Sequence, residues 1–131
     1  MLNFENIGDK FVQVVHTPEW EQLQKKYNQC NDIYVLGHGG NLAVADHAAV
    51  DMTRLSNGTK NAICPGSAVV ATSYINDTSF EQWMVNWLIS RTSTRTASQM
   101  RKSLVLGVSS SGNSVDILKA LQWAQANGMQ V

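Results

Sequence analysis

The chain has 131 residues, 44% of them hydrophobic, which is enough for a real core and argues against disorder. Ten basic and ten acidic residues cancel, and a nucleic-acid surface needs clustered positive charge, so direct nucleic-acid binding is not expected. No apolar run approaches the roughly 20 residues that span a bilayer, no signal peptide is recognisable, and Cys30 and Cys64 lack metal-type spacing. We therefore expect a cytoplasmic protein that does not enter a membrane.

The chain divides into an N-terminal helical segment, residues 1–30, and a main domain, residues 31–131. Helix is predicted over residues 4–29, where apolar side chains recur at helical spacing. Within it, Thr17 can act as an N-cap, and Pro18 suits the first turn of a helix.

Strands and helices alternate through the first half of the main domain. Residues 32–36 are short, apolar and partly β-branched, which predicts a buried strand, and residues 37–41 form a glycine-rich turn. A helix is expected over 42–55, ending before Asn57-Gly58, followed by a short strand at 61–64.

The middle of the chain predicts a short helix at 67–74, a turn at 76–78 and a helix at 80–89. The Ser/Thr-rich stretch 90–103 favours a solvated loop, although it carries the densest group of basic residues. Three tryptophans at helical spacing suit either ligand stacking or a core or subunit contact: Trp83, Trp87 and Trp123.

The last part predicts a strand at 104–108, a helix at 114–126, and the opening of a further strand at 129–131. Alternating strands and helices predict a parallel sheet with helices on both faces, a three-layer α/β/α fold. We expect strands 33–36 and 104–108 to be inner strands that end at the same edge. The chain is expected to be a fold truncated at its C-terminus.

The turn after the third expected strand concentrates hydroxyl groups at a helix start. We call it the serine loop: Ser109, Ser110, Ser111, Gly112, Asn113 and Ser114. A helix N-terminus offers unpaired N–H groups and a dipole that favours an anion, and glycine allows close approach. The loop either cradles a phosphate group or merely caps the helix. It lacks the lysine of a P-loop, and the first glycine-rich turn lacks the third glycine of a dinucleotide fingerprint.

Residues 105–114 resemble the hallmark loop of the sugar isomerase (SIS) domain family, usually I-S-x-S-G-x-S/T, and residues 36–41 resemble its first loop, usually G-N-G-G-S. The phosphoheptose isomerase subfamily, which acts on sedoheptulose 7-phosphate, is the most similar. Residues 46–54 resemble its H-x-x-E-E-L-T-G-R helix, and residues 74–77 its G-N-D turn. The resemblance implies a flavodoxin-like topology and sugar-phosphate binding.

The resemblance also implies roles for individual residues. Phosphate would be held by the side chains of three serines and by contacts from two neighbours in the same loop: Ser109, Ser111, Ser114, Ser110 and Asn113. Asn41 stands where the first-loop serine of the family contacts the substrate, and Asp77 matches an aspartate near the reacting end of the sugar. His38 stands where the family usually has asparagine, and it either donates to the substrate or fills the turn.

His47 and Asp51 stand four residues apart and would share one face of a helix. The resemblance implies a metal-ligand histidine and a catalytic carboxylate here, with zinc as the expected metal, although the family has glutamate where this chain has Asp51. The alternative is an ordinary i,i+4 pair at the surface or in a subunit contact. The resemblance places a second catalytic histidine and a glutamine metal ligand beyond Val131.

Two functions follow as hypotheses. The first is a sugar-phosphate-binding SIS domain that acts as a phosphoheptose isomerase, converting an aldose into a ketose or the reverse. The second is a non-catalytic SIS module that binds a sugar phosphate or a protein partner. The resemblance implies a homodimer or homotetramer with N-terminal helices between the subunits, for which six apolar residues are suited: Phe4, Phe11, Val14, Val15, Trp20 and Leu23.

Overall fold

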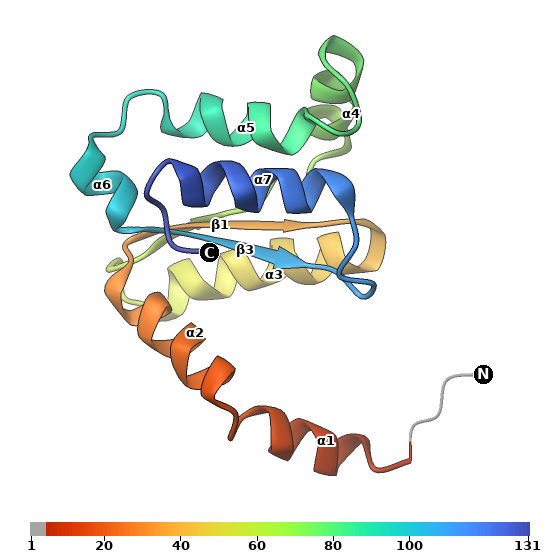
Figure 1. The fold of residues 1–131 in the computed structure, drawn as a ribbon, viewed down its shortest axis with the longest axis vertical. Coiled ribbons are helices and arrows are strands. Elements are labelled where there is room, and N and C mark those ends of the chain that lie inside the picture. Colours follow the sequence, from red (N-terminus) through yellow and green to blue (C-terminus); the bar gives the residue numbers. More distant parts are fainter. Residues whose placement is uncertain (1–4) are drawn as a thin grey trace.

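The chain is a mixed α/β structure with a parallel sheet (Figure 1). A computed structural model describes residues 5–131, which include three strands in the order β2-β1-β3. The strands are β1 (Asp32–Gly37), β2 (Asn61–Ile63) and β3 (Ser103–Val108). The helices of the described chain are α1 (Ile7–Val14), α2 (Pro18–Gln29), α3 (Gly39–Leu55), α4 (Ala68–Asp77), α5 (Trp83–Thr92), α6 (Ala97–Arg101) and α7 (Val115–Ala126).

The register of the sheet brings the ends of β1 and β3 together. The two strands pair in parallel along their whole length, from Asp32 opposite Ser103 to Gly37 opposite Val108. β2 pairs with only the first half of β1. Because β1 and β3 finish side by side, the turns that follow them start at the same edge of the sheet. The prediction that these two strands end at one edge is confirmed. The prediction that both are inner strands holds for β1 but is wrong for β3, which lies at the side of the sheet because only Gln130 bridges to its outer side within the described residues.

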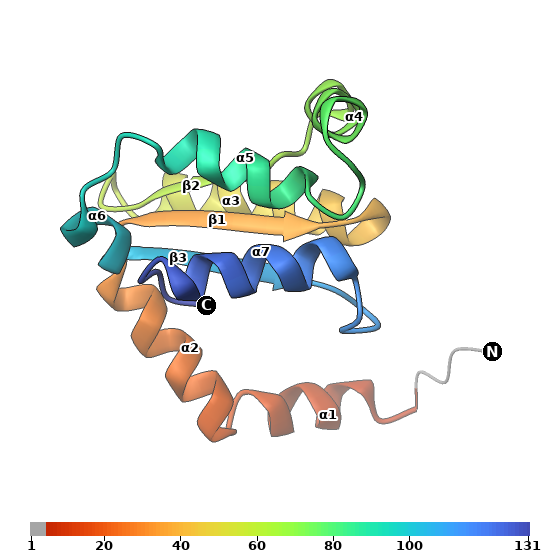
Figure 2. The same ribbon diagram turned by 45° about the horizontal axis from the view of Figure 1, so that its top comes forward.

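Helices cover both faces of the sheet (Figures 1 and 2). Alternate residues of β1 point to opposite faces, so Ile33 and Val35 pack with α3 while Tyr34 and Leu36 pack under α5 and α7. All four are buried, which explains why this strand reads as a continuous apolar run. The arrangement is compatible with the expected α/β/α layers.

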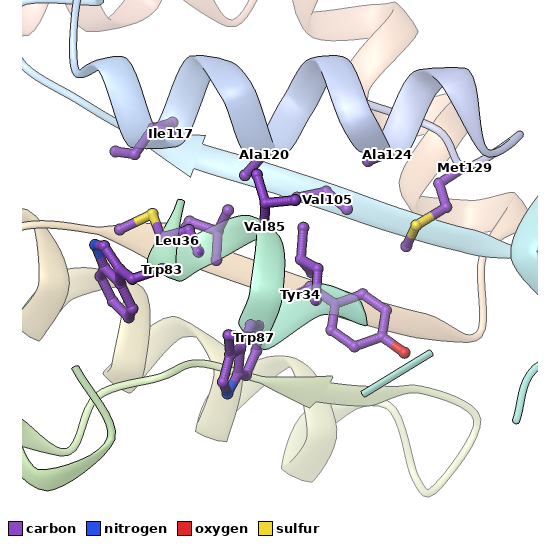
Figure 3. Close-up of a cluster of buried hydrophobic side chains, with 12 residues drawn as sticks. Tyr34, Leu36, Trp83, Val85, Trp87, Val105, Ile117, Ala120, Ala124 and Met129 are labelled. Atoms are coloured by element: carbon purple, nitrogen blue, oxygen red, sulfur yellow. The ribbon is translucent and has the colours of Figure 1, made fainter. Parts of the chain in front are cut away.

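The larger core cluster lies between the sheet, α5 and α7 (Figure 3). Trp83 and Trp87 are each only 1% exposed and are among its largest members, while Trp123 is half-buried against its rim. Trp87 meets the ring of Tyr34 edge-on, with 6.0 Å between the ring centroids. The core role considered for these tryptophans is therefore confirmed for the two on α5.

The N-terminal segment is two helices and not the single helix predicted over residues 4–29. Pro18 starts α2, because proline lacks the N–H that a helix interior requires and its ring clashes with the preceding turn. Thr17 is the N-cap as expected, and its hydroxyl accepts the N–H of Trp20 at 3.2 Å. In both views α1 extends away from the sheet (Figures 1 and 2). Phe4, one of the residues suited to subunit packing, lies outside the described residues.

The stretch 90–103 is not the solvated loop that its composition favoured. It completes α5, forms α6 and enters β3. A capping box starts α6, since the Thr96 hydroxyl accepts the N–H of Gln99 and the Gln99 side chain accepts the N–H of Thr96. Arg95 is paired with Asp32 at the start of β1, with 3.1 Å between Nη2 and Oδ1.

Three smaller differences concern the ends of elements. α3 begins at Gly39, so most of the turn expected over 37–41 belongs to the helix. α4 continues to Asp77 and includes part of the turn expected at 76–78. The strand expected to open at 129–131 is reduced to one parallel bridge between Gln130 and Leu104. None of the helices that residues 5–131 form is both long and apolar enough to cross a membrane.

Candidate functional site

The candidate site lies at the edge where β1 and β3 end, and Gly37 lets the first turn of α3 pack closely against the end of β1. A Cβ at Gly37 would stand 2.7 Å from the carbonyl oxygen of Asn41, nearer than real Cβ contacts allow. Glycine therefore lets the first turn of α3 fold back over the end of β1. As a result, the start of α3 lies beside the serine loop, which follows β3.

The hydroxyl groups of the serine loop face one another across the loop. The Oγ of Ser109 lies 3.1 Å from the Oγ of Ser114 and 3.5 Å from that of Ser111. The backbone N–H of Gly112 donates to Ser109 Oγ at 3.1 Å, and the N–H of Asn113 donates to Ser111 Oγ at 3.2 Å. Gly112 has φ 68°, a left-handed conformation that glycine adopts without strain. Hydroxyl and amide groups thus converge on one exposed point.

The Ser114 hydroxyl does not cap α7, although Ser114 occupies the N-cap position. The side chains at the starts of α2, α4 and α6 each accept a backbone N–H from the following turn, whereas those at the starts of α1, α3 and α5 do not. At Ser114 the hydroxyl instead faces Ser109 across the loop. The interpretation of the loop as a simple helix cap therefore lacks the hydrogen bond on which it depends.

Asn41 joins the first turn of α3 to the serine loop. Its side-chain amide donates to Ser110 Oγ at 3.0 Å, across 69 residues of sequence. The structure therefore brings together all six residues expected to bind substrate or phosphate: Asn41, Ser109, Ser110, Ser111, Asn113 and Ser114.

The expected catalytic residues form separate groups. His47 and Asp51 face each other on α3, with 3.3 Å between Nε2 and Oδ2, and the His47 side chain is 79% exposed. Asp51 also accepts from Arg54 Nη2 at 3.0 Å. Asp77, at the end of α4, accepts from the Asn76 amide at 3.3 Å. The hydrogen bonds that these residues make do not connect them to the serine loop.

A zinc site would need more ligands than His47 and Asp51 provide. Zinc in proteins takes three or four side-chain ligands in tetrahedral geometry. No group of three or more histidine, cysteine or acidic side chains suited to a metal occurs within residues 5–131. These two side chains alone do not fit a zinc ion, and zinc stays a prediction from the resemblance.

A buried polar network beside the serine loop was not foreseen. Asp116, in the first turn of α7, has no exposed surface, and its Oδ2 accepts the indole N–H of Trp83 at 2.7 Å. Nε2 of His38 lies 2.9 Å from Oδ1 and 2.7 Å from Oδ2 of the same carboxylate. The imidazole is stacked on the ring of Phe80, with 5.6 Å between the centroids. Residue His38 therefore does more than fill the turn.

The sequence contains a signal for this network. Asp116, Ala120 and Ala124 recur every four residues on α7, and the two alanines belong to the buried core. A carboxylate on an apolar helix face must find hydrogen-bond donors, because an unpaired buried charge is strongly unfavourable. His38, at the end of the neighbouring strand, was a candidate for that partner.

No protein-family model matches the chain, and no solved structure matches it. The resemblance to SIS domains therefore rests on the sequence motifs alone.

Proposed function

We propose that this chain is a sugar-phosphate-binding SIS domain of flavodoxin-like topology, and that it acts as an aldose–ketose isomerase of the phosphoheptose type. The observation that carries the proposal is the serine loop. Its hydroxyls and backbone N–H groups converge at the start of α7, and the Ser114 hydroxyl is not used as a helix cap.

The chemistry of the loop suits a phosphomonoester. A phosphate oxygen arriving there would take the place of Ser109 Oγ and Ser111 Oγ as acceptor of the Gly112 and Asn113 N–H groups. The released hydroxyls can then rotate and donate to the phosphate, since a hydroxyl is both a donor and an acceptor. The α7 dipole favours the negative charge. Binding of this kind needs neither lysine nor a metal ion.

In the isomerase, Asp51 and His47 would move or hold protons beside the carbonyl carbon of the sugar, and Asp77 would contact its reacting end. The resemblance adds zinc as the metal and a homodimer or homotetramer in the cytoplasm as the working form. These assignments need the substrate to extend from the serine loop along α3.

A second function, a non-catalytic module that binds a sugar phosphate or a protein partner, is favoured by one observation. Arg54 and His47 both contact the Asp51 carboxylate, so its two oxygens already have partners at the protein surface. A carboxylate held in this way would have to break these contacts before it could take a proton from a substrate.

The experiment that tests phosphate binding is a calorimetric titration of the parent chain and of the double variant Ser109→Ala/Ser111→Ala. The ligands are sedoheptulose 7-phosphate and inorganic phosphate. Each hydrogen bond to a charged group contributes about 1.5–3 kcal/mol. Losing two should weaken binding by about 100-fold or more, at roughly 1.4 kcal/mol per decade.

The matched control is the double variant Ser93→Ala/Ser98→Ala, which removes two exposed hydroxyls from the other serine-rich stretch and should leave the affinity unchanged. Equal affinity in the serine-loop variant and the parent would overturn the phosphate cradle. Conversion of sedoheptulose 7-phosphate by the parent would separate the isomerase from the non-catalytic module.

A further inference from the structure

His38 is held in one orientation at the end of β1. It follows Gly37, which pairs with Val108, so its backbone starts beside Ser109, the first residue after β3. The Asp116 carboxylate fixes one edge of the imidazole, and the rings of Phe80 and Trp83 lie against it at centroid distances of 5.6 Å and 6.2 Å. The side chain is nevertheless 35% exposed, so part of the ring is accessible to solvent.

Asp116 determines which ring nitrogen carries a proton. An ionised carboxylate only accepts hydrogen bonds, so the nitrogen that faces it, Nε2, must be the donor. A neutral His38 then has its lone pair on Nδ1, for which residues 5–131 provide no hydrogen-bond partner. A histidine oriented by a buried carboxylate, with its other nitrogen unoccupied, has the arrangement of a general base.

The carboxylate itself is fixed from three directions. The indole N–H of Trp83 and the Nε2–H of His38 both donate to it, and it lies in the first turn of α7, where the helix dipole favours negative charge. Figure 3 shows Trp83 in the core cluster with Ile117, the neighbour of Asp116 on α7. Because the aspartate is part of the core, it cannot turn away and release the histidine.

The network is next to the serine loop along the chain and in space. Asp116 is two residues after Ser114, and His38 is three residues before Asn41, whose amide donates to Ser110. A phosphorylated sugar held by the loop and extending across the start of α3 would have its carbon chain beside the imidazole.

We propose that His38 and Asp116 form a proton-transfer dyad that acts on the carbonyl end of the bound sugar phosphate. The inference rests on the proposed function and assigns the proton transfer to His38 in place of His47 and Asp51. Starting from the ketose, His38 Nδ1 takes a proton from C1. The C1–H electron pair forms the C1=C2 double bond, and the carbonyl pair moves to O2.

The second half returns the proton. The O1 hydroxyl proton passes to O2 of the enediolate, the C1=O bond forms, and the C=C pair takes the proton from Nδ1 to give a C2–H bond. The product is the aldose, and Nδ1 has its lone pair again. No oxidant, reductant or metal enters the balance. Asp116 is a positioning residue, which holds the imidazole in the tautomer that can accept a proton.

The test follows exchange of the carbon-bound hydrogen of sedoheptulose 7-phosphate with solvent deuterium, by proton NMR, alongside calorimetric titration with inorganic phosphate. The variants are His38→Asn and Asp116→Asn. In Asp116→Asn, the side-chain oxygen accepts the indole N–H of Trp83, and the side-chain amide N–H donates to Nε2 of His38. The imidazole proton therefore moves to Nδ1. We expect the parent to catalyse the exchange. In both variants the exchange rate should fall at least about 100-fold, which is the size of loss expected when a general base is removed. Both variants should bind phosphate with the affinity of the parent.

His16→Asn is the matched control. His16 is exposed between α1 and α2, so this substitution should leave the exchange rate unchanged. Exchange that persists in His38→Asn and disappears in His47→Gln would overturn the dyad and leave the proposed isomerase in place. Phosphate binding without exchange in the parent would overturn the dyad in favour of the non-catalytic module. Absence of any binding by the parent would overturn the proposed function itself.

If His38→Asn does not fold, the tautomer supplies an independent measurement on the parent. Long-range nitrogen–proton correlation spectra of the ring, recorded over a range of pH, should show the single proton of the neutral imidazole on Nε2. In Asp116→Asn they should show it on Nδ1. A proton on Nδ1 in the parent would overturn the dyad.

Discussion

Burial of the Cys64 thiol and, to a smaller extent, the negative charge of Asp46 together raise its pKa to about 12. Burial also raises the pKa of Cys30, with the ammonium of Lys60 acting in the opposite direction. Both residues are free thiols. Since the thiolate is the reactive form, these cysteines should be inert structural residues and not nucleophiles.

This leads to a prediction about pH. In the folded chain, alkylation of Cys64 by iodoacetamide should stay slow through pH 9, whereas in urea it should rise steeply as the thiol ionises at its ordinary pKa. Because the pKa is higher in the folded state, the thiol's contribution to stability is fully present below about pH 9. It should be lost as the pH rises towards the folded value. Mass spectrometry of the alkylated peptide measures the rate, and fast labelling of the native chain at pH 8 would contradict the assignment.

Which side chains meet was harder to predict from the sequence than which residues are buried. The serine loop could be recognised because its six residues are contiguous in the sequence and carry the hydroxyl groups and the glycine that suit an anion. The contact between His38 and Asp116 joins residues 78 positions apart. It depends on the register of β1 with β3 and on the packing of α7, and neither can be predicted from residues that are neighbours in the sequence.

Elements with strong local signals were predicted well. β1 and β3 are short apolar runs, and their predicted bounds differ from the observed ones by a single residue at one end. The break before α2 follows from Pro18, since a proline inside a continuous helix would remove a hydrogen bond. The helix-start signal at Thr17 marks this break, although the apolar spacing continues across it.

α6 was missed because its composition is polar and its stability comes from its ends. The reciprocal hydrogen bonds of Thr96 and Gln99 start the helix, and the salt bridge from Arg95 to Asp32 anchors the segment to β1. The strand expected after α7 was predicted from apolar composition, but most of it does not form. An apolar sequence favours extension, but within the described chain only Gln130 pairs, on the outer side of β3.

The capping box gives a prediction at this scale. Thr96→Ala removes the hydroxyl that accepts the Gln99 N–H, and should lower the free energy of unfolding by about 0.5–2 kcal/mol. Urea denaturation followed by circular dichroism measures the change. Ser98→Ala is the control, because Ser98 is exposed within α6 and alanine is the better helix former. Equal stability of Thr96→Ala and the parent would show that the cap does not hold α6.

In the whole molecule, α1 presents an apolar stripe that no part of the described chain covers. Ile7, Phe11 and Val14 are 61%, 68% and 53% exposed, and they recur at helical spacing. α1 has no buried residue. A stripe of this kind is typical of an interface between proteins.

We therefore expect the chain to associate through α1. Phe11→Asp places a charge in the stripe and should shift the chain towards monomer, with little effect on the sheet domain. Sedimentation velocity over a range of concentrations measures the mass, and Gln13→Asp is the control because it adds the same charge outside the stripe. A parent chain that remains monomeric at high concentration would contradict the expected association.

The central claim is that the serine loop binds the phosphate group of a sugar. It is tested most directly by titrating nitrogen-15-labelled chain with sedoheptulose 7-phosphate and following the backbone amide signals. We predict saturable shifts that are largest at Gly112 and Asn113, whose N–H groups would exchange a serine hydroxyl for a phosphate oxygen. Inorganic phosphate should shift the same signals. Shifts confined to other parts of the chain, or none at saturating ligand, would contradict the claim.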